Sequence, residues 1–301
     1  MVGAGPVTEV VIGAATTAAV EQFLGLFGLE PVDRPHLDQP AAAQLGLGPP
    51  TGAAVRLATP QAPSGTATVL VVPTGVDGAP PMGWAHGPRA LDIYTTDLDA
   101  SVAEVRDAGH EVSPEAVLAG GPMRMRQALV TGPEGLPVVL VESTHRRSSI
   151  CDGADAPRHS ELHSVVWCVE DHESELQRWS AAGWTAGATI SFSEPSVSAE
   201  LGLPESPTPI TMTMLSDAEV TPTRLELMTF DDHRGSPPGS VGAVAGGGIM
   251  ALVMGADDLD ASVAAWGSGA RFADEAHTTQ GARSRAGTTL GGIRIVLVER
   301  G

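Results

Sequence analysis

The sequence predicts an α+β fold, in which four βαβββ modules pair into two similar domains. Residues 97–103 have the sequence Asp-Leu-Asp-Ala-Ser-Val-Ala, and the same seven residues return at 258–264. Each copy follows an apolar run and precedes a helical pattern, and each unit closes on Val-Leu-Val-Glu, at 139–142 and 296–299. Such self-similarity is typical of a duplicated architecture.

A weaker repeat relates the other two units. Ala-Gln-Leu-Gly at 43–46 is echoed by Ala-Glu-Leu-Gly at 199–202. The first unit therefore matches the third, and the second matches the fourth.

Apolar runs, capping residues and turn residues predict the elements of each module. In the first module, a helix capped by Thr16 or Thr17 follows the opening strand, and a hairpin closes the unit; these elements cover 7–14, 18–26, 53–57 and 66–72. In the second, Asp97 or Asp99 caps the helix, and the elements cover 90–94, 100–108, a strand near 111, 124–130 and 137–142. The third has elements at 162–169, 171–182, 210–215 and 224–228.

Stretches rich in Gly, Pro and polar residues set the expected domain boundaries. We expect modules at about 6–75 and 88–145 to form a first domain (1–145), and modules at about 160–231 and 247–301 to form a second (158–301), with 146–157 as the linker.

Composition narrows the range of partners. The chain has 17 Lys+Arg against 36 Asp+Glu, a formal charge of −19, and this balance disfavours nucleic acid and anionic membranes. Two cysteines exclude a disulfide framework. No basic leader with a long apolar run opens the sequence, and no run has membrane-spanning length. We expect a cytoplasmic monomer or homodimer that binds a hydrophobic small molecule.

Paired βαβββ modules, each with a strand followed by a capped helix, resemble the vicinal oxygen chelate superfamily. That superfamily includes glyoxalase I, extradiol dioxygenases, fosfomycin-resistance enzymes and bleomycin-binding immunity proteins. The resemblance covers nearly the whole chain and is most specific at 91–109, 132–142 and 163–183. It implies a sheet from two modules curled around a cavity, once per half. This fold hosts many chemistries, so function must be argued from the site.

In metal-using relatives, a histidine on the first strand of a module and a glutamate on its last strand bind the metal. The matching histidine positions here hold Glu9, Ala90, Ser164 and Ala251, and the glutamate positions hold Val71 (or Val69), Val139, Glu226 and Val296. A catalytic divalent site needs about three protein ligands. We therefore expect no metal and no cofactor. A remaining alternative keeps a metal through Glu226 and His163, if a one-residue slip turns His163 inward.

Three residues are the predicted catalytic groups: Glu9, Asp92 and Tyr94. If Ala90 faces the cavity, strand alternation makes Asp92 and Tyr94 face it as well. A buried, unpaired carboxylate is costly, so Asp92 is either an acid–base group or the partner of a nearby arginine. Glu9 holds the corresponding place in the first module. We expect Glu9 and Asp92 to form a carboxylate pair in one cavity, which suits proton transfer. The alternative is that Glu9 is a surface charge at a strand edge, in a slipped register.

Five further residues are predicted to bind the ligand: Arg124, Arg126, Ser164, Trp167 and Glu226. The two arginines alternate with methionines, and they bind a carboxylate or enolate oxygen if they face inward. A solvated arginine stripe is the alternative. Glu226 is expected to hydrogen-bond the ligand or Ser164. Trp167 either lines an aromatic-friendly pocket or packs in the core.

The sequence thus favours a metal-independent small-molecule enzyme of secondary metabolism. It would act by proton transfer, as in isomerisation, cyclisation or elimination, on a hydrophobic or aromatic metabolite. The alternative is a drug- or metabolite-binding immunity protein, because the emptied metal-ligand positions make the cavity apolar. A third hypothesis is a metal-dependent ring-cleaving dioxygenase.

Overall fold

The computed structural model describes residues 3–45, 52–74, 85–118, 125–203, 206–231, 248–273, 277–279 and 282–300. Module one contains β1 (Val7–Ala14), α1 (Thr17–Gly25), β2 (Glu30–Asp33), α2 (Gln39–Gln44), β3 (Val55–Ala58) and β4 (Thr68–Pro73). Module two contains β5 (Gly87–Thr95), α3 (Leu98–Asp107), β6 (Glu111–Val112), β7 (Ala116–Leu118), β8 (Met125–Thr131), the 3-10 turn η1 (Pro133–Gly135) and β9 (Pro137–Ser143).

Module three contains β10 (His159–Cys168), α4 (His172–Ala181), β11 (Thr185–Phe192), α5 (Pro195–Glu200), β12 (Ile210–Ser216) and β13 (Arg224–Phe230). Module four contains β14 (Gly248–Ala256), α6 (Leu259–Trp266), the 3-10 turn η2 (Gly267–Gly269), β15 (Ala270–Phe272), β16 (His277–Thr279), β17 (Ala282–Thr289) and β18 (Arg294–Glu299). The short helices α2 and α5, absent from the predicted βαβββ pattern, end at the echoed sequences of modules one and three.

The repeated sequences meet at the start of a helix in both copies. The side chain of Asp97 caps α3 by accepting a hydrogen bond from Ala100 N, and Asp258 caps α6 in the same way. The glutamate that ends each Val-Leu-Val-Glu strand accepts from the first helical N–H: Glu142 from Leu98 N at 2.8 Å, and its counterpart in module four from Leu259 N at 3.4 Å. The repeat therefore encodes a strand–helix junction, because these acids satisfy amides at the helix start.

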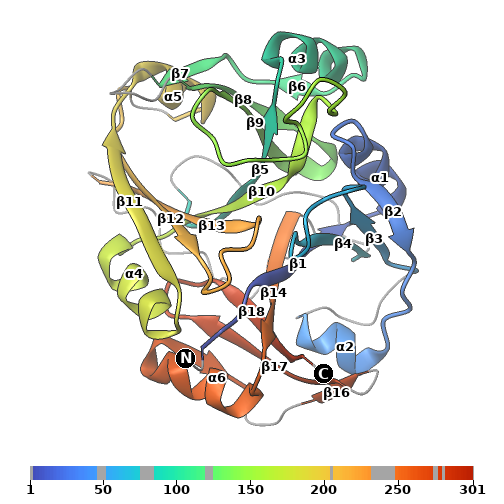
Figure 1. Cartoon of the computed structure of the whole chain (residues 1–301), viewed down its shortest axis with the longest axis vertical. Coiled ribbons are helices and arrows are strands. Elements are labelled where there is room, and N and C mark those ends of the chain that lie inside the picture. The colour runs from blue at the N-terminus through green and yellow to red at the C-terminus, as the bar shows by residue number, and fades with distance from the viewer. Residues whose placement is uncertain are drawn as a thin grey trace.

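The strands form two nine-stranded sheets (Figure 1). Sheet A joins modules one and four in the order β15-β17-β18-β14-β1-β4-β3-β2, with β16 beside β17. Sheet B joins modules two and three in the order β11-β12-β13-β10-β5-β9-β8-β6, with β7 beside β8. The opening strands of the paired modules lie antiparallel at the centre, β1 against β14 and β10 against β5.

This pairing differs from the expected one, in which consecutive modules share a domain. Residues 146–157, expected to link two domains, instead connect β9 and β10 of the same sheet. One hydrophobic cluster joins both sheets through the helices between them. In it Trp179 of α4 lies 4.9 Å from Trp266 of α6, ring centroid to centroid, and Figure 1 shows these two helices side by side.

The two sheets differ in what covers their concave faces. In sheet A that face carries an apolar cluster: Val11, Leu45, Ala54, Leu70, Val72, Ala251 and Val296. In sheet B it carries a second apolar cluster that surrounds an open cavity. Within the ranges described, no helix is both long and apolar enough to cross a membrane.

Candidate active site

The cavity of sheet B has a volume of about 490 Å³, in the range of small-molecule sites. Apolar side chains from both modules form most of its wall: Leu118, Met125, Leu129, Val139, Val141, Val166, Ile190, Phe192, Val197, Leu201, Ile210, Met212, Met214 and Met228. The polar groups gather on the central strands β5, β10 and β13 and on the segment after β9. The cavity therefore has apolar walls and a polar floor, which is formed by these central strands and this segment.

Two carboxyl groups form the centre of that floor. Asp92 on β5 and Glu226 on β13 both line the cavity and are 5% and 7% exposed. The two carboxyl groups are close enough for each to shift the pKa of the other, and a hydrogen bond between them would need one proton because two carboxylates have no donor. Ser164 Oγ donates to Asp92 Oδ2 at 2.9 Å. Asp92 Oδ1 receives no N–H or hydroxyl donor from the described part of the chain, so it is left for Glu226 or for a ligand.

Burial shifts the pKa of both acids upward. Burial raises the pKa of Asp92 to about 6, with hydrogen bonds from Ser164 and Glu226 and the charge of Arg224 acting in the opposite direction. Burial, and then the charge and hydrogen bond of Asp92, raise the pKa of Glu226 well above its ordinary value. Burial and the mutual repulsion of the two carboxylates therefore favour a state in which the pair retains one proton. One group is then a base and the other an acid.

A second polar cluster lies beside this pair. A bulge in β10, where Leu162 faces Ile93 and Ser164 faces Asp92, turns His163 into the cavity. Its ring stacks on Tyr94 at a centroid distance of 3.9 Å. Arg224 Nη2 lies 2.5 Å from His163 Nε2 and 3.4 Å from the Tyr94 hydroxyl.

These groups have fixed charges near neutral pH. Burial lowers the pKa of His163 well below its usual value, followed by the charges of Arg224, Arg147 and Arg146, so the imidazole is neutral and accepts from Arg224. Burial raises the pKa of Tyr94 to about 12, so its phenol keeps its proton. Tyr94 is therefore a hydrogen-bond donor for a ligand.

A third buried acid supports the wall opposite. Glu200, at the end of α5, is 3% exposed, and its Oε2 accepts a 2.7 Å hydrogen bond from Gln127 Nε2. Burial raises the pKa of Glu200 to about 8, with the Gln127 hydrogen bond opposing the shift and the charge of Asp92 adding to it. Gln127 lines the cavity, so the neutral acid holds the orientation of a ligand-facing amide.

The donor set does not fit the metal that the family resemblance implies. Across the described ranges, no three His, Cys, Asp or Glu side chains are grouped so that they could hold a metal ion. Asp92 accepts a hydrogen bond from Ser164 Oγ, and His163 accepts one from the Arg224 cation. These groups therefore point their lone pairs at donors that the chain already supplies.

Among the predicted catalytic residues, the structure brings together Asp92 and Tyr94 but not Glu9. Glu9 lies on β1 of sheet A, where it forms an ion pair with Arg56 and accepts from Thr68 Oγ1 at 3.2 Å. The expected pair of Glu9 with Asp92 in one cavity is therefore not formed. The residues that lie beside Asp92 are Glu226 and Ser164, and we predicted both of these as ligand-binding residues.

Two other predicted ligand contacts lie away from the cavity. Arg126 pairs with Asp99 at 2.9 Å, with Glu115 at 2.8 Å and with Glu142 at 3.4 Å. Trp167 is 1% exposed and belongs to the cluster beneath the helices, because its neighbour Val166 takes the cavity side of β10. Arg124 lies outside the described residues.

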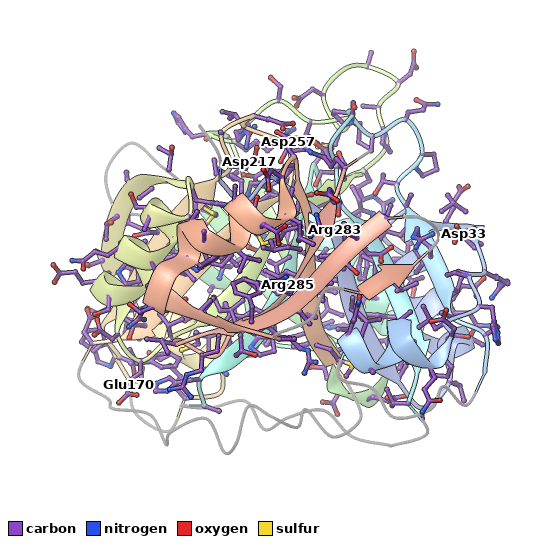
Figure 2. The ribbon with its side chains drawn as sticks, turned by 90° about the horizontal axis from the view of Figure 1, so that it is seen from below. Asp33, Glu170, Asp217, Asp257, Arg283 and Arg285 are labelled. Carbon is purple, nitrogen blue, oxygen red and sulfur yellow. The ribbon has the colours of Figure 1, made fainter. Side chains whose placement is uncertain are left out.

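The Arg126 cluster is repeated in module four, which identifies it as structural. Arg283 on β17 pairs with Asp260 of α6 at 2.8 Å and with Glu299 at 3.2 Å. Figure 2 shows Arg283 and Arg285 along β17, and Arg285 also pairs with Asp260. Both copies tie a helix start to a strand of the sheet. They are surface ion pairs with no access to a ligand in the cavity.

Sequence reasoning missed Arg224, Arg146, Arg147, Gln127 and Glu200. Arg224 had a usable signal, because it stands two residues before Glu226 and strand alternation puts both on one face. The echo of Gln44 by Glu200 was a second signal, since a carboxyl replaces an amide. Arg146 and Arg147 carried none, because they were assigned to a linker.

Comparison with known proteins supports the fold. No protein-family model matches the chain, and no curated protein matches its sequence. Glyoxalase I from Zea mays is similar in structure, with a TM-score of 0.68, 15% identity and 98% of this chain and 92% of that chain covered. A mutant of the same enzyme has a TM-score of 0.69 at 16% identity, with 98% of this chain and 94% of that chain covered. A putative dioxygenase from Bacillus subtilis gives 0.64, at 11% identity and 99% and 86% coverage. The chain thus has the predicted vicinal oxygen chelate fold.

Proposed function

We propose that this chain is a metal-independent enzyme that transfers protons on a hydrophobic or aromatic small molecule in the cavity of sheet B. The observation that carries the proposal is the buried pair of Asp92 and Glu226 on the floor of an apolar cavity, where burial raises the pKa of both acids. Perturbed carboxyls that face a cavity are typical of acid–base sites.

The two carboxyl groups take up and release the same number of protons in one reaction cycle. Ionised Asp92 takes a proton from an acidic C–H or O–H of the ligand, and neutral Glu226 gives its proton to another ligand atom or to a leaving group. Transfer across the hydrogen bond between the two acids then returns the proton to Glu226. Ser164 keeps Asp92 oriented through the 2.9 Å bond, and the Tyr94 phenol donates to a ligand oxygen where charge develops. This cycle fits isomerisation, cyclisation or elimination.

A second candidate is a binding protein for a drug or metabolite. It is favoured by Ala90 and Val139, which stand at former metal-ligand positions and leave apolar surface on the cavity floor. The same cavity would then hold its ligand without changing it. Both functions use the same walls and differ only in the chemical fate of the ligand.

The test is mass spectrometry of a host metabolite extract incubated with stoichiometric protein in the presence of a chelator. The enzyme predicts that a compound disappears and an isomer or elimination product replaces it, and that Asp92→Asn abolishes this conversion. Glu104→Gln, which changes an exposed carboxylate on α3, is the matched control and retains conversion. A compound that is held and released unchanged identifies a binding protein and overturns the enzyme.

A further inference from the structure

The cavity is rich in arginine although the chain is acidic. The chain has a net charge of −19 and 17 Lys and Arg residues in all. Four of these residues line the cavity: Arg89, Arg146, Arg147 and Arg224. Arg89 lies near the start of β5. The other three surround the end of the cavity at Tyr94 and His163, and their charges all lower the pKa of His163. The three form what we call the arginine end.

Two arginines of this end lack a carboxylate partner in the described residues. Arg146 is balanced by Asp152 at 2.6 Å. Within the described part of the chain, Arg147 donates to two backbone carbonyls, Val220 O at 3.0 Å and Thr221 O at 3.3 Å. The Nε of Arg224 is buried and receives no partner from the part of the chain that is described. Unused guanidinium donors in a partly desolvated site are costly unless an anion binds there.

The nearby acids form no ion pair with Arg147 or Arg224 in the described part of the chain. Burial lowers the pKa of Arg224, and the nearby charges of Tyr94, Glu226 and Asp92 act in the opposite direction. Glu161 lies in a side chamber of about 210 Å³ that shares Tyr94, His163 and Arg147 with the main cavity. Its carboxylate accepts from Ser149 Oγ at 2.7 Å and from Ile150 N at 3.1 Å. An anion is therefore accommodated on the main-cavity side, away from Glu161.

We propose that the arginine end binds one anionic group, such as a carboxylate or sulfonate, of a ligand whose remaining surface is apolar. Arg147 and Arg224 supply the donors, and the methionine, leucine and phenylalanine walls hold the rest. This inference rests on the proposed function for the location of the ligand, and it defines the substrate class as amphiphilic monoanions. It does not depend on whether the ligand is turned over.

Two fluorescent probes of matched shape test it: 8-anilinonaphthalene-1-sulfonate and N-phenyl-1-naphthylamine, which differ by the sulfonate. We expect the wild-type protein to bind the anionic probe at least tenfold more tightly, and each probe to displace the other. Arg147→Gln is expected to reduce this preference to below threefold without changing the affinity for the neutral probe. Arg126→Gln removes an equal charge from the surface cluster and keeps the preference.

Equal affinity of the wild-type protein for both probes would overturn the proposal, as would an unchanged preference in Arg147→Gln. The neutral probe reports whether the variant has folded. If Arg147→Gln also loses the neutral probe, Arg147→Lys decides, because it retains the charge and is expected to retain the preference. A preference that survives in a protein without turnover would contradict the enzyme and leave the anion site standing. Turnover without any preference for the anionic probe would contradict the anion site and leave the proposed enzyme function standing.

Discussion

Sheets A and B are built from the same pair of modules, yet they treat their concave faces in opposite ways. The strand registers align Asp92 of β5 with Val253 of β14, and Glu226 of β13 with Leu70 of β4. In sheet A these positions are apolar: Leu70 belongs to the apolar cluster and Val253 packs against it. In sheet B the same positions hold two acids on the floor of a cavity. The scaffold is shared, and the chemistry resides in the side chains placed on it.

The helix that covers each face shows the same contrast. In sheet A, Ser284 Oγ donates to Gln44 Oε1 at 2.8 Å. In sheet B, the equivalent pair is Gln127 with Glu200, and the amide has become a carboxyl. Sheet B has three buried acids where the equivalent positions of sheet A have none. Each buried carboxyl is destabilising when ionised, and the proposed function explains why such groups are present in sheet B.

The largest expected effect is on catalysis in sheet B. Asp92→Asn and Glu226→Gln are each expected to lower kcat by about 10²–10⁴-fold, as is usual for loss of a general acid or base. The double variant is expected to lose no more than the worse single variant, because the two groups act through one shared proton. In the wild type, activity should rise with pH through about 6, where Asp92 ionises. Steady-state kinetics on the converted metabolite measure kcat of the single variants, kcat of the double variant and the pH dependence of the wild type. If the free-energy losses of the two single variants added up in the double variant, a shared proton would be contradicted.

The next effect is on stability at high pH. The folded-state pKa of Glu200, about 8, is above its unfolded value, so its stabilising contribution is complete below pH about 4 and is lost as pH rises through 8. Glu200→Gln copies the residue of sheet A and is expected to gain roughly 4 kcal/mol over the wild type between about pH 5 and about pH 9. Urea unfolding at both pH values measures this. Glu30→Gln, an exposed change, should show no such gain.

Asp92→Asn should show a smaller gain of the same sign. The folded-state pKa of Asp92 is about 6, so its ionisation destabilises the protein above that pH and not below pH about 4. We expect the variant to be more stable than the wild type by about 2 kcal/mol at about pH 8, relative to about pH 4, as urea unfolding at both pH values would measure. A variant that loses activity without this stability gain would show that Asp92 is stabilised by a cation rather than strained by burial.

The smallest effect is expected in sheet A. Glu9→Gln weakens a partly exposed ion pair with Arg56 and should cost at most about 1 kcal/mol. Its kcat should equal that of the wild type, because Glu9 and Asp92 lie in different sheets. A loss of kcat comparable to that of Asp92→Asn would instead support the original prediction that Glu9 is catalytic.

Part of this site could be predicted because strand alternation is local. Asp92 and Tyr94 followed from one strand, and Glu226 followed from its position on the last strand of a module. The predicted fold was confirmed because repeated caps and strand ends mark each module. These features depend on residues close together in the sequence.

The rest depends on contacts that no local pattern encodes. Four similar modules have several compatible pairings, and the observed one brings module two beside module three across β5 and β10. That pairing separates Glu9 from Asp92 and turns an expected linker into a cavity wall with Arg146 and Arg147. The inward turn of His163 follows from a bulge, which shifts the register by one residue at a single point.

The most direct test of the central claim is a ¹³C-NMR pH titration of the labelled Asp and Glu carboxyl carbons, assigned with Asp92→Asn and Glu226→Gln. We predict that at neutral pH the pair binds a single proton, held mainly by Glu226, with one step near pH 6 and another well above the usual range for glutamate. Two carboxyls that both titrate near their usual pKa of about 4 would contradict a shared proton and, with it, the acid–base role assigned to sheet B.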